Sequence, residues 1–230
     1  MTAMTGSSEH DTVPHHFART NKWEDCKRIC PSARVVLDCG ANVGQTARNL
    51  RQAYPAARIY SFEPVSAVFN KLREAAHVLN VRPVQAAVAD RSGTTEINLT
   101  ASPESNSLLG FLEKDNPLAE AHRVVGHETV PVWRLDDWCR ESGVDPSHVD
   151  LLKMDVQGAE LEALKGATEI LRTVRIVLLE VAFVPFYEGC PLIGDIEAFL
   201  AKHGFRREAL YASVRPEVWA DGMYVRTATG

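Results

Sequence analysis

The chain has 230 residues, of which 45% are hydrophobic and 24% are charged, and its formal net charge is −5. These values fit one sizeable domain of a soluble protein, and no apolar run approaches the roughly 18 residues that a membrane-spanning helix needs. No Lys/Arg-rich run occurs, which argues against a nucleic-acid partner because phosphates are neutralised by concentrated positive charge. We expect neither a membrane nor a nucleic acid as a partner.

The N-terminal segment, residues 1–18, is polar and is expected to be flexible, with one domain following over residues 19–230. This segment lacks the basic flank and apolar stretch of a secretory signal, so the expected location is the cytoplasm. The five cysteines are scattered without CxxC spacing, which predicts reduced thiols. The eight histidines show neither HxxxH nor HExxH spacing, so no histidine metal site is expected.

From about residue 19, apolar runs of strand length alternate with longer amphipathic segments, which predicts an α/β fold whose mostly parallel sheet is covered by helices. The first elements expected are a helix at 19–30, a strand at 34–39, a helix at 43–53, a strand at 57–63, a helix at 66–79 and a strand at 83–90. The next run, 94–100, alternates β-branched and polar residues and predicts an added strand that pairs back on its neighbour.

A long polar stretch, residues 101–128, has few core-forming residues at regular spacing, and we expect a mobile lid or insertion there with room for one short helix. The elements expected beyond it are a strand and helix at 128–143, a strand at 148–156, one helix over 157–173, a strand at 175–183, a helix at 194–203 and strands at 205–213 and 218–226. The last two strands are predicted to form an antiparallel hairpin at the sheet edge.

The stretch VVLDCGANVGQT runs from a buried strand ending at Asp38 into Gly40 and Gly44, the pattern of a nucleotide-type pocket at the carboxyl edge of a parallel sheet. Glycines at such a turn let backbone and ligand approach closely. Asn42 replaces the middle glycine of GxGxxG, and the acid before the turn would repel a phosphate. Asp38 could instead accept hydrogen bonds, directly or through water, from the cationic amino-acid part of S-adenosylmethionine.

Two further acids follow the next two predicted strands. Glu63 ends the second strand about twenty residues after the glycine turn, where such folds place a carboxylate that accepts both ribose hydroxyls. Asp90 follows the third strand, where it could hold the adenine edge or merely begin an Asp-Arg-Ser-Gly turn, and both interpretations stay open. Asp38, Gly40, Gly44 and Glu63 lie together at consecutive strand ends, and this joint placement favours a ligand site over isolated caps or solvated acids.

A second constellation lies in VDLLKMDVQGAELEALKGA. Lys153 and Asp155 share one face of a strand, and a lysine in a buried strand needs an anionic partner, for which Asp155 and Glu180 are available. These groups could perform general base chemistry or hold a divalent cation, or they could form a buried ion-pair network that only fixes the sheet edge. Glu160 falls in the first turn of the following helix, where the helix dipole favours a negative charge.

Two loops contain further candidate residues for binding or activating a substrate. His122 and His127 are further candidate bases if the polar insertion folds over the cleft. Phe186 and Tyr187 follow Pro185 directly after a strand that ends at the cleft, so they are the aromatic residues best placed to pack against a substrate.

Over about residues 33–226 the chain resembles the FkbM family of S-adenosylmethionine-dependent methyltransferases. The resemblance rests on VLDCGANVGQT, SFEPV, AAVADRSG, SNSL, DLLKMDVQGAELEALKGA, VLLEV and DGMYVR. It implies a Rossmann-like class I methyltransferase fold, with a mostly parallel seven-stranded sheet and an antiparallel C-terminal hairpin. It also implies methyl transfer to an oxygen, commonly on sugars, polyketides or other secondary metabolites. Gln157 stands where the family usually has a glutamate, which removes a charge.

For the reaction that this resemblance implies, the protein must hold the acceptor oxygen in line with the methyl group and remove its proton. We expect Asp155 to be the base or the residue that orients the hydroxyl, with Lys153 tuning it and Glu180 as its partner. A Mg²⁺ ion held by Asp155 and Glu180, as in catechol-type methyltransferases, could lower the hydroxyl pKa.

Two alternatives belong to other functional classes. The first is a non-catalytic S-adenosylmethionine-binding module, which the change at Gln157 leaves open. The second is an NAD-dependent oxidoreductase, which the missing middle glycine disfavours. The expected partner is a small molecule with a hydroxyl group, which the sequence does not identify. The oligomeric state stays open, and a homo-oligomer is one alternative.

Overall fold

The structure of the protein, a computed structural model, describes residues 16–112, 120 and 122–227. The expected flexible segment at 1–18 therefore lies almost entirely outside the described residues, as does part of the expected lid at 101–128. Within the described ranges, no helix combines the length and the apolarity needed to cross a bilayer.

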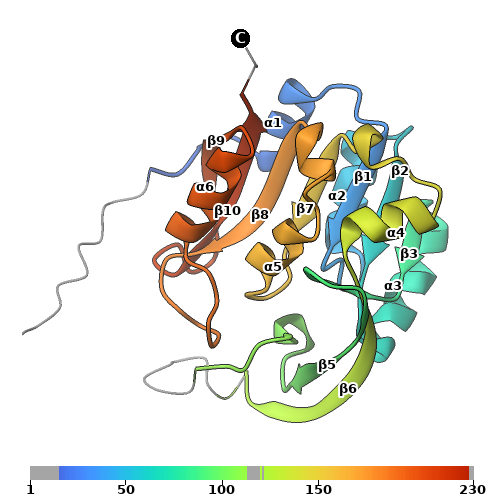
Figure 1. The fold of residues 1–230 in the computed structure, drawn as a ribbon, viewed down its shortest axis with the longest axis vertical. Helices are drawn as coiled ribbons and strands as arrows, with labels where there is room; N and C mark the ends of the chain where they lie inside the picture. Colours follow the sequence, from blue (N-terminus) through green and yellow to red (C-terminus); the bar gives the residue numbers. More distant parts are fainter. Residues whose placement is uncertain (1–15, 113–119, 121, 228–230) are drawn as a thin grey trace, which may run out of the picture.

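A seven-stranded sheet forms the centre of the molecule, with strand order β3-β2-β1-β7-β8-β10-β9 (Figure 1). Its strands are β1 (Val35–Cys39), β2 (Arg58–Phe62), β3 (Arg82–Val84), β7 (Leu151–Met154), β8 (Ile176–Ala182), β9 (Phe205–Ala212) and β10 (Trp219–Arg226). All neighbours pair in parallel except β10, which runs antiparallel to both β8 and β9. The predicted α/β fold, with its parallel sheet and antiparallel C-terminal hairpin, is confirmed.

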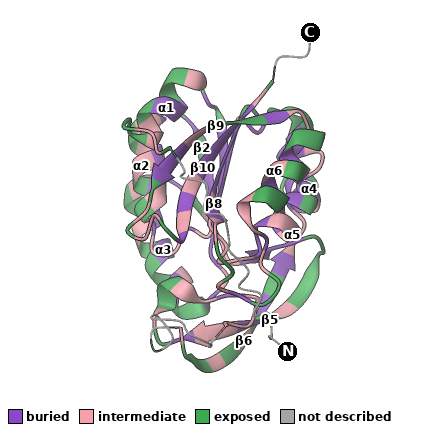
Figure 2. Cartoon of the chain, turned by 90° about the vertical axis from the view of Figure 1, so that its left-hand side faces the viewer, coloured by how far each residue is buried: buried purple, intermediate pink, exposed green. Residues whose placement is uncertain are grey.

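Helices cover both faces of this sheet, and the strands between them are buried (Figure 2). One face carries α1 (Lys22–Ile29), α2 (Gln45–Ala53) and α3 (Ser66–Leu79), and the other carries α4 (Leu135–Glu141), α5 (Glu160–Lys165) and α6 (Ile193–Lys202). All five residues of β1 are buried, and successive residues contribute to opposite cores: Val36 packs in one hydrophobic cluster and Leu37 in the other. A strand buried on both faces needs the continuous apolar run that the sequence has here.

The strand expected over 83–90 is divided between two sheets, which corrects the prediction of one strand. β3 ends at Val84, where the amide of Ala86 donates to the Val84 carbonyl at 3.1 Å in a tight turn. The chain then enters a second, three-stranded sheet of order β4-β6-β5, seen below the main sheet in Figure 1. Its strands are β4 (Ala87–Val88), β5 (Gly93–Thr100) and β6 (Val124–Trp133). The added strand β5 therefore pairs with β6, not with the strand before it.

The expected lid at 101–128 is partly regular structure. It begins with a single 3₁₀ turn, η1 (Pro103–Ser105), and its last five residues belong to β6. Between them, the amide of Asn98 donates to the Ser107 carbonyl at 2.9 Å, which fixes the described part of the segment against β5. A lid function for this segment stays a prediction.

The helix expected over 157–173 is also shorter than predicted. α5 ends at Lys165, and a 3₁₀ turn, η3 (Ile170–Arg172), follows. A Cβ atom on Gly166 would lie only 2.0 Å from the Ala89 carbonyl oxygen, so the chain passes β4 where only glycine fits. Gly166, the C-cap of α5, is thus where the chain lies against the residue that follows β4.

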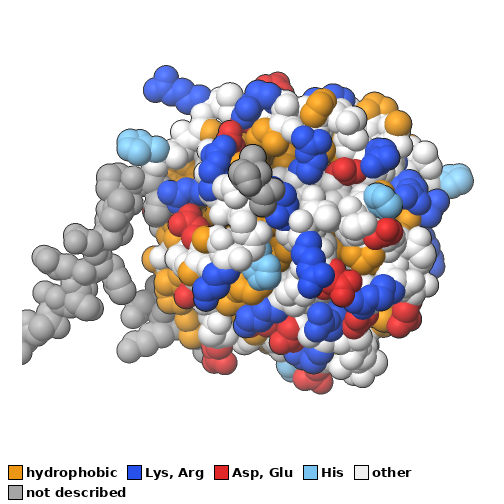
Figure 3. All heavy atoms as spheres, turned by 45° about the horizontal axis from the view of Figure 1, so that its top comes forward, with side chains coloured by type: hydrophobic (Ala, Val, Ile, Leu, Met, Phe, Trp, Pro, Cys, Tyr) orange, Lys and Arg blue, Asp and Glu red, His pale blue; other side chains and the backbone are white. Residues whose placement is uncertain are grey.

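Charged side chains on the outside are paired locally rather than gathered by sign. Arg206 and Glu208 lie 2.7 Å apart, and Arg140 and Asp137 lie 2.8 Å apart. On the face shown in Figure 3, Lys and Arg side chains are interspersed with Asp and Glu side chains. Exposed pairs of this kind contribute at most about 1 kcal/mol each, so stability depends on the buried sheet.

We predict that Gly166→Ala lowers the free energy of unfolding by about 1–3 kcal/mol, because the added methyl overlaps the Ala89 carbonyl. Gly194→Ala is the matched control, since Gly194 lies in α6 with no atom within 4 Å of the position of a Cβ. That variant should be unchanged or up to about 1 kcal/mol more stable. Urea titrations followed by circular dichroism measure both, and equal stabilities of the two variants would contradict the close contact.

Candidate functional site

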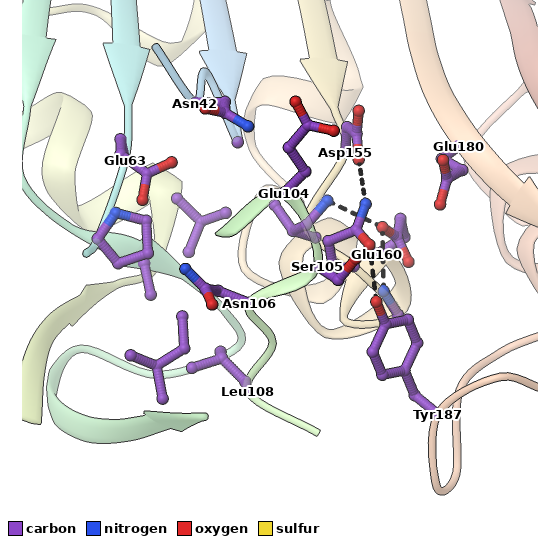
Figure 4. Close-up of a pocket in the computed structure, with 18 of the residues that line it drawn as sticks. Asn42, Glu63, Glu104, Ser105, Asn106, Leu108, Asp155, Glu160, Glu180 and Tyr187 are labelled. Carbon is purple, nitrogen blue, oxygen red and sulfur yellow. Dashed lines mark hydrogen bonds between the residues drawn. The ribbon is translucent and has the colours of Figure 1, made fainter. Parts of the chain in front are cut away.

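A cavity of about 550 Å³ opens at the carboxyl ends of the central parallel strands. Its lining comes from the turns after β1, β2 and β7, from β8 and the loop that follows it, and from β4, β5 and the segment after β5. In Figure 4, Asn42 and Glu63 lie at one end of the cavity, and Glu180 and Tyr187 lie at the other. Convergence of polar side chains at this edge is the usual arrangement of ligand sites in open α/β sheets.

The glycine-rich turn after β1 is shaped by contacts within the protein. Gly40 has φ 75°, and a Cβ there would lie 1.7 Å from the carbonyl oxygen of Asp155. Gly44 has φ 98°, and a Cβ there would point at Leu72 of α3, 3.4 Å away. The missing side chain of Gly40 thus makes room for the Asp155 carbonyl, and the expectation that both glycines let a ligand touch the backbone stays a prediction. Gly40 and Asn42 still line the cavity, whereas Gly44 does not.

Glu63 lies at the end of β2 with only 7% of its surface exposed, and it lines the cavity. Its carboxylate accepts hydrogen bonds from the backbone amides of Val65, at 2.9 Å, and of Asn42. Burial raises the pKa of Glu63 to about 7, and the two amide donors only partly offset that effect. Glu63 forms no ion pair among the described residues. Its carboxylate could accept further hydrogen bonds from a ligand in the cavity.

Lys153 finds its closest anionic partner in Asp38, which the sequence did not predict. The two residues are paired in register on the adjacent strands β7 and β1, and the ammonium nitrogen lies 3.5 Å from Asp38 Oδ1 and 3.8 Å from Asp155 Oδ2. Lys153 also donates to the Gly40 carbonyl at 3.0 Å. Glu180, the other expected partner, is not among the ion-pair partners of Lys153 that the described residues provide.

The charge state of Lys153 follows from these neighbours. Burial alone would lower the pKa of Lys153, but the attraction of Asp38 and Asp155 outweighs it and raises the pKa above the usual value. Lys153 is therefore a cation and not a base. Asp38 is fully buried and does not line the cavity, so its contact with a ligand stays a prediction.

Asp155 is the accessible carboxylate of the second constellation, with 37% of its side chain exposed at the cavity wall. Gln157 donates from Nε2 to Asp155 Oδ1 at 2.8 Å, and Tyr187 donates its hydroxyl to Gln157 Oε1 at 2.7 Å. The Asp155 carboxylate, the Gln157 amide and the Tyr187 phenol thus form one chain of hydrogen bonds.

The other two carboxylates of this region differ from Asp155. Glu160 is buried and accepts from the amides of Val156 at 2.9 Å and Gly158 at 3.4 Å, so it stabilises the turn before α5. Burial raises the pKa of Glu160 to about 7. Burial and then the charge of Asp155 raise the pKa of the half-buried Glu180 well above its usual range. A larger fraction of both carboxyl groups is therefore protonated at neutral pH than of an ordinary glutamate.

The predicted magnesium site is not supported. Asp155 and Glu180 both line the cavity. Within the described ranges, however, no three His, Cys, Asp or Glu side chains are grouped so that they could hold a metal ion. Two carboxylates without further protein ligands among the described residues do not make a built cation site.

Aromatic side chains form the wall near Glu180. Phe186 and Tyr187 both line the cavity, and so does Trp219, whose ring lies 5.3 Å from that of Phe186 in an edge-on arrangement. His122 lines the cavity as well and stacks on Phe111 with ring centroids 4.1 Å apart. His127 does not line it, because it lies in β6 beside Glu96.

The sequence did not identify the cavity wall formed by the segment after β5. Ser102, Pro103, Glu104, Ser105, Asn106 and Leu108 line the cavity there. Glu104 lies between the two ends of the cavity in Figure 4. The only sequence signal was the SNSL motif, which carried the family resemblance but no chemistry. Asp90 does not line the cavity; it is exposed and pairs with Arg91 at 3.5 Å.

Comparisons with known proteins agree on one family. Residues 38–207 match the methyltransferase FkbM domain. Over 162 residues the chain is 35% identical to the 2-O-methyltransferase NoeI of Sinorhizobium fredii, which covers 67% of this chain and 66% of NoeI. Over 198 residues it is 33% identical to the methyltransferase sdnD of Sordaria araneosa, covering 76% and 74%. Over 151 residues it is 30% identical to the hexuronic acid methyltransferase AglP of Haloferax volcanii, covering 64% and 55%. The chain thus spans about two thirds of NoeI and about half of AglP.

We predict that Lys153→Met destabilises the fold by about 3–5 kcal/mol, because it leaves Asp38 buried without a counter-charge. Lys165→Met is the control, since that lysine is 46% exposed and lies 3.9 Å from Glu162, and it should cost less than about 1 kcal/mol. The double variant Asp38→Asn/Lys153→Met should recover part of the loss. Urea unfolding measures all three, and equal effects of the two lysine changes would contradict the buried pair.

Proposed function

The chain belongs to the FkbM family of methyltransferases, and from this premise we propose that it transfers the methyl group of S-adenosylmethionine to a hydroxyl oxygen of an uncharged, polyhydroxylated small molecule. Sugars and glycosylated secondary metabolites are the acceptors that we expect. One observation carries the proposal: a single cavity joins Glu63 after β2 to Asp155 after β7, and it continues to the aromatic wall at Phe186. A donor and an acceptor can therefore share one enclosed space.

The residues at the Glu63 end suit S-adenosylmethionine. Glu63 is a buried carboxylate without an ion pair in the described part of the chain, and two neighbouring ribose hydroxyls are donors that would satisfy it. Ala86, Ala87 and Val88 give the wall beside it small apolar surfaces that can cover a flat ring. Asn42, which lines the cavity, stands in place of the middle glycine of GxGxxG, and this departure argues against NAD. When bound, S-adenosylmethionine supplies a methyl group on a sulfonium that carries its own leaving group.

Asp155 is the group to which we assign the hydroxyl proton of the acceptor. It is the exposed carboxylate of the region, and the protonated Lys153 lies 3.8 Å from its Oδ2. Glu160 is engaged with two backbone amides, and burial raises the pKa values of both Glu160 and Glu180. The remaining work is positioning, since a fixed near-attack geometry supplies most of the acceleration in such transfers.

The acceptor end favours an uncharged substrate. Glu104 and Asp155 offer oxygens that accept hydrogen bonds from hydroxyls, and Phe186 and Trp219 offer flat apolar surfaces. Lys153, already paired with Asp38, is the one Lys or Arg among the described lining residues. No further Lys or Arg in the described lining would compensate an acceptor carboxylate, although AglP is named for a hexuronic acid.

We predict that S-adenosylhomocysteine binds about tenfold more weakly at about pH 6 than at about pH 8, because Glu63, whose pKa is about 7, must be ionised to accept two hydroxyl hydrogen bonds. Glu63→Gln should bind weakly at both pH values and lose the dependence. Asp90→Asn should behave as wild type, since Asp90 does not line the cavity. Calorimetric titration measures this, with NAD as a further ligand; NAD binding without S-adenosylhomocysteine binding would overturn the proposal.

We predict that neutral methyl hexosides and glycosylated metabolites are methylated from S-adenosylmethionine more efficiently than the matching hexuronides, because the acceptor end carries carboxylates. Mass spectrometry of the products shows which atom gains the methyl group. Asp155→Asn should bind S-adenosylhomocysteine like wild type and lose about 10²–10⁴-fold in turnover. A preference for hexuronides, transfer to nitrogen or carbon, or full turnover by Asp155→Asn would each contradict the corresponding part of the proposal.

A further inference from the structure

We propose that Gln157 and Tyr187 are positioning residues that orient the Asp155 carboxylate, so that the loop after β8 controls this group at the cavity wall. The inference rests on the proposed function only for what Asp155 does to an acceptor. The hydrogen-bonded arrangement itself can be tested without any acceptor.

The two hydrogen bonds fix the orientation of the Gln157 amide. A carboxylate can only accept, so the group that faces Asp155 Oδ1 at 2.8 Å must be the NH₂. The hydroxyl of Tyr187 donates to the amide oxygen at 2.7 Å. An amide rotated by half a turn would set its oxygen against the carboxylate and its NH₂ against the phenol. Asp155 therefore selects this orientation, and Tyr187 supports it by donating to the amide oxygen.

The backbone of Gln157 is held in an unusual conformation for this purpose. Its φ is 54°, in the left-handed region that side chains other than glycine, Asn and Asp seldom adopt. The hydroxyl of Ser107 donates to the Gln157 carbonyl at 2.6 Å and, as an acceptor, binds the Leu109 amide at 3.0 Å. The next residue, Gly158, leaves room for Tyr187, because a Cβ on Gly158 would lie 2.8 Å from the tyrosine ring.

Tyr187 is also anchored to the segment after β5. It is 6% exposed, and its ring packs edge-on against Phe111 with centroids 5.6 Å apart. On either side of it, the amide of Glu188 donates to the Gly110 carbonyl at 2.8 Å and the amide of Leu112 donates to the Phe186 carbonyl at 2.8 Å. The segment after β5 and the loop after β8 thus meet at the phenol that donates to the Gln157 amide oxygen.

The surroundings of Asp155 explain why an amide serves here. The charged or titratable groups that face it are Lys153 on β7, Asp38 on β1, Glu160 on α5, Glu180 on β8 and Tyr187 in the loop after β8. Lys153 is the one cation among them. A neutral donor from Gln157 stabilises the ionised carboxylate without adding a further negative charge. A carboxylate at position 157 would instead compete with Asp155 for a proton.

The test follows the titration of the Asp155 side-chain carboxyl by carbon-13 NMR in the intact chain. Gln157→Glu should move the midpoint upward by about one pH unit or more, because two carboxylates in contact share a proton. Gln157→Met should move it upward by less, because it removes a donor without adding a charge. In Tyr187→Phe, the Gln157 amide protons should exchange with water about tenfold faster. These readouts distinguish positioning from a merely structural role.

Tyr211→Phe is the matched control, because Tyr211 is also 6% exposed and donates its hydroxyl to a carboxylate, that of Asp25, but does not line the cavity. It should leave the Asp155 titration and the Gln157 amide exchange unchanged. With an acceptor in hand, Gln157→Met should lower kcat while S-adenosylhomocysteine affinity stays unchanged. An Asp155 midpoint that is the same in wild type, Gln157→Glu and Gln157→Met would overturn the inference, whether or not any acceptor is methylated.

Discussion

A buried cation at the junction of β1 and β7 is the interaction on which the cavity depends. Lys153 lies beside the fully buried Asp38, donates to the Gly40 carbonyl and reaches Asp155 at the cavity wall. The Lys153 ammonium therefore compensates the buried charge of Asp38 and also attracts the Asp155 carboxylate at the cavity wall. The glycine at position 40 completes the junction, because its missing Cβ admits the Asp155 carbonyl at a distance that no other residue allows.

Around this junction, the two sheets contribute different parts of the cavity. The seven-stranded sheet supplies the polar side chains at its strand ends, among them Glu63 and Asp155. The small sheet supplies apolar wall at Ala87, Val88 and Ile97, and the segment that follows β5 supplies the polar wall that includes Glu104. A polar floor beneath a mixed wall suits a ligand pair in which both members carry several hydroxyls.

Residues at the ends of parallel strands could be predicted from the sequence. Contacts that depend on which distant segments lie side by side could not. Glu63 and Asp155 were found because carboxyl ends of parallel strands converge at one edge. The partner of Lys153 was missed, because only the topology brings β1 beside β7, more than a hundred residues apart in the chain. The sequence predicted Gly166 within a helix and gave no sign that Ala89, directly after β4, lies against it. The wall at 102–106 has no hydrophobic periodicity, which is the signal that such analysis needs.

The division of one expected strand into β3 and β4 has a consequence for how proteins of this shape can diverge. Within a few residues the chain leaves the sheet that carries Glu63 and enters the sheet that carries the apolar wall. Substitutions in the segment after β5, which carries Glu104, can reshape the polar wall without touching the strand ends that carry Glu63 and Lys153. Under the proposed function, selection could thus act on the choice of acceptor almost independently of the donor site, and lineages that inherit the same strand ends would be free to acquire new substrates.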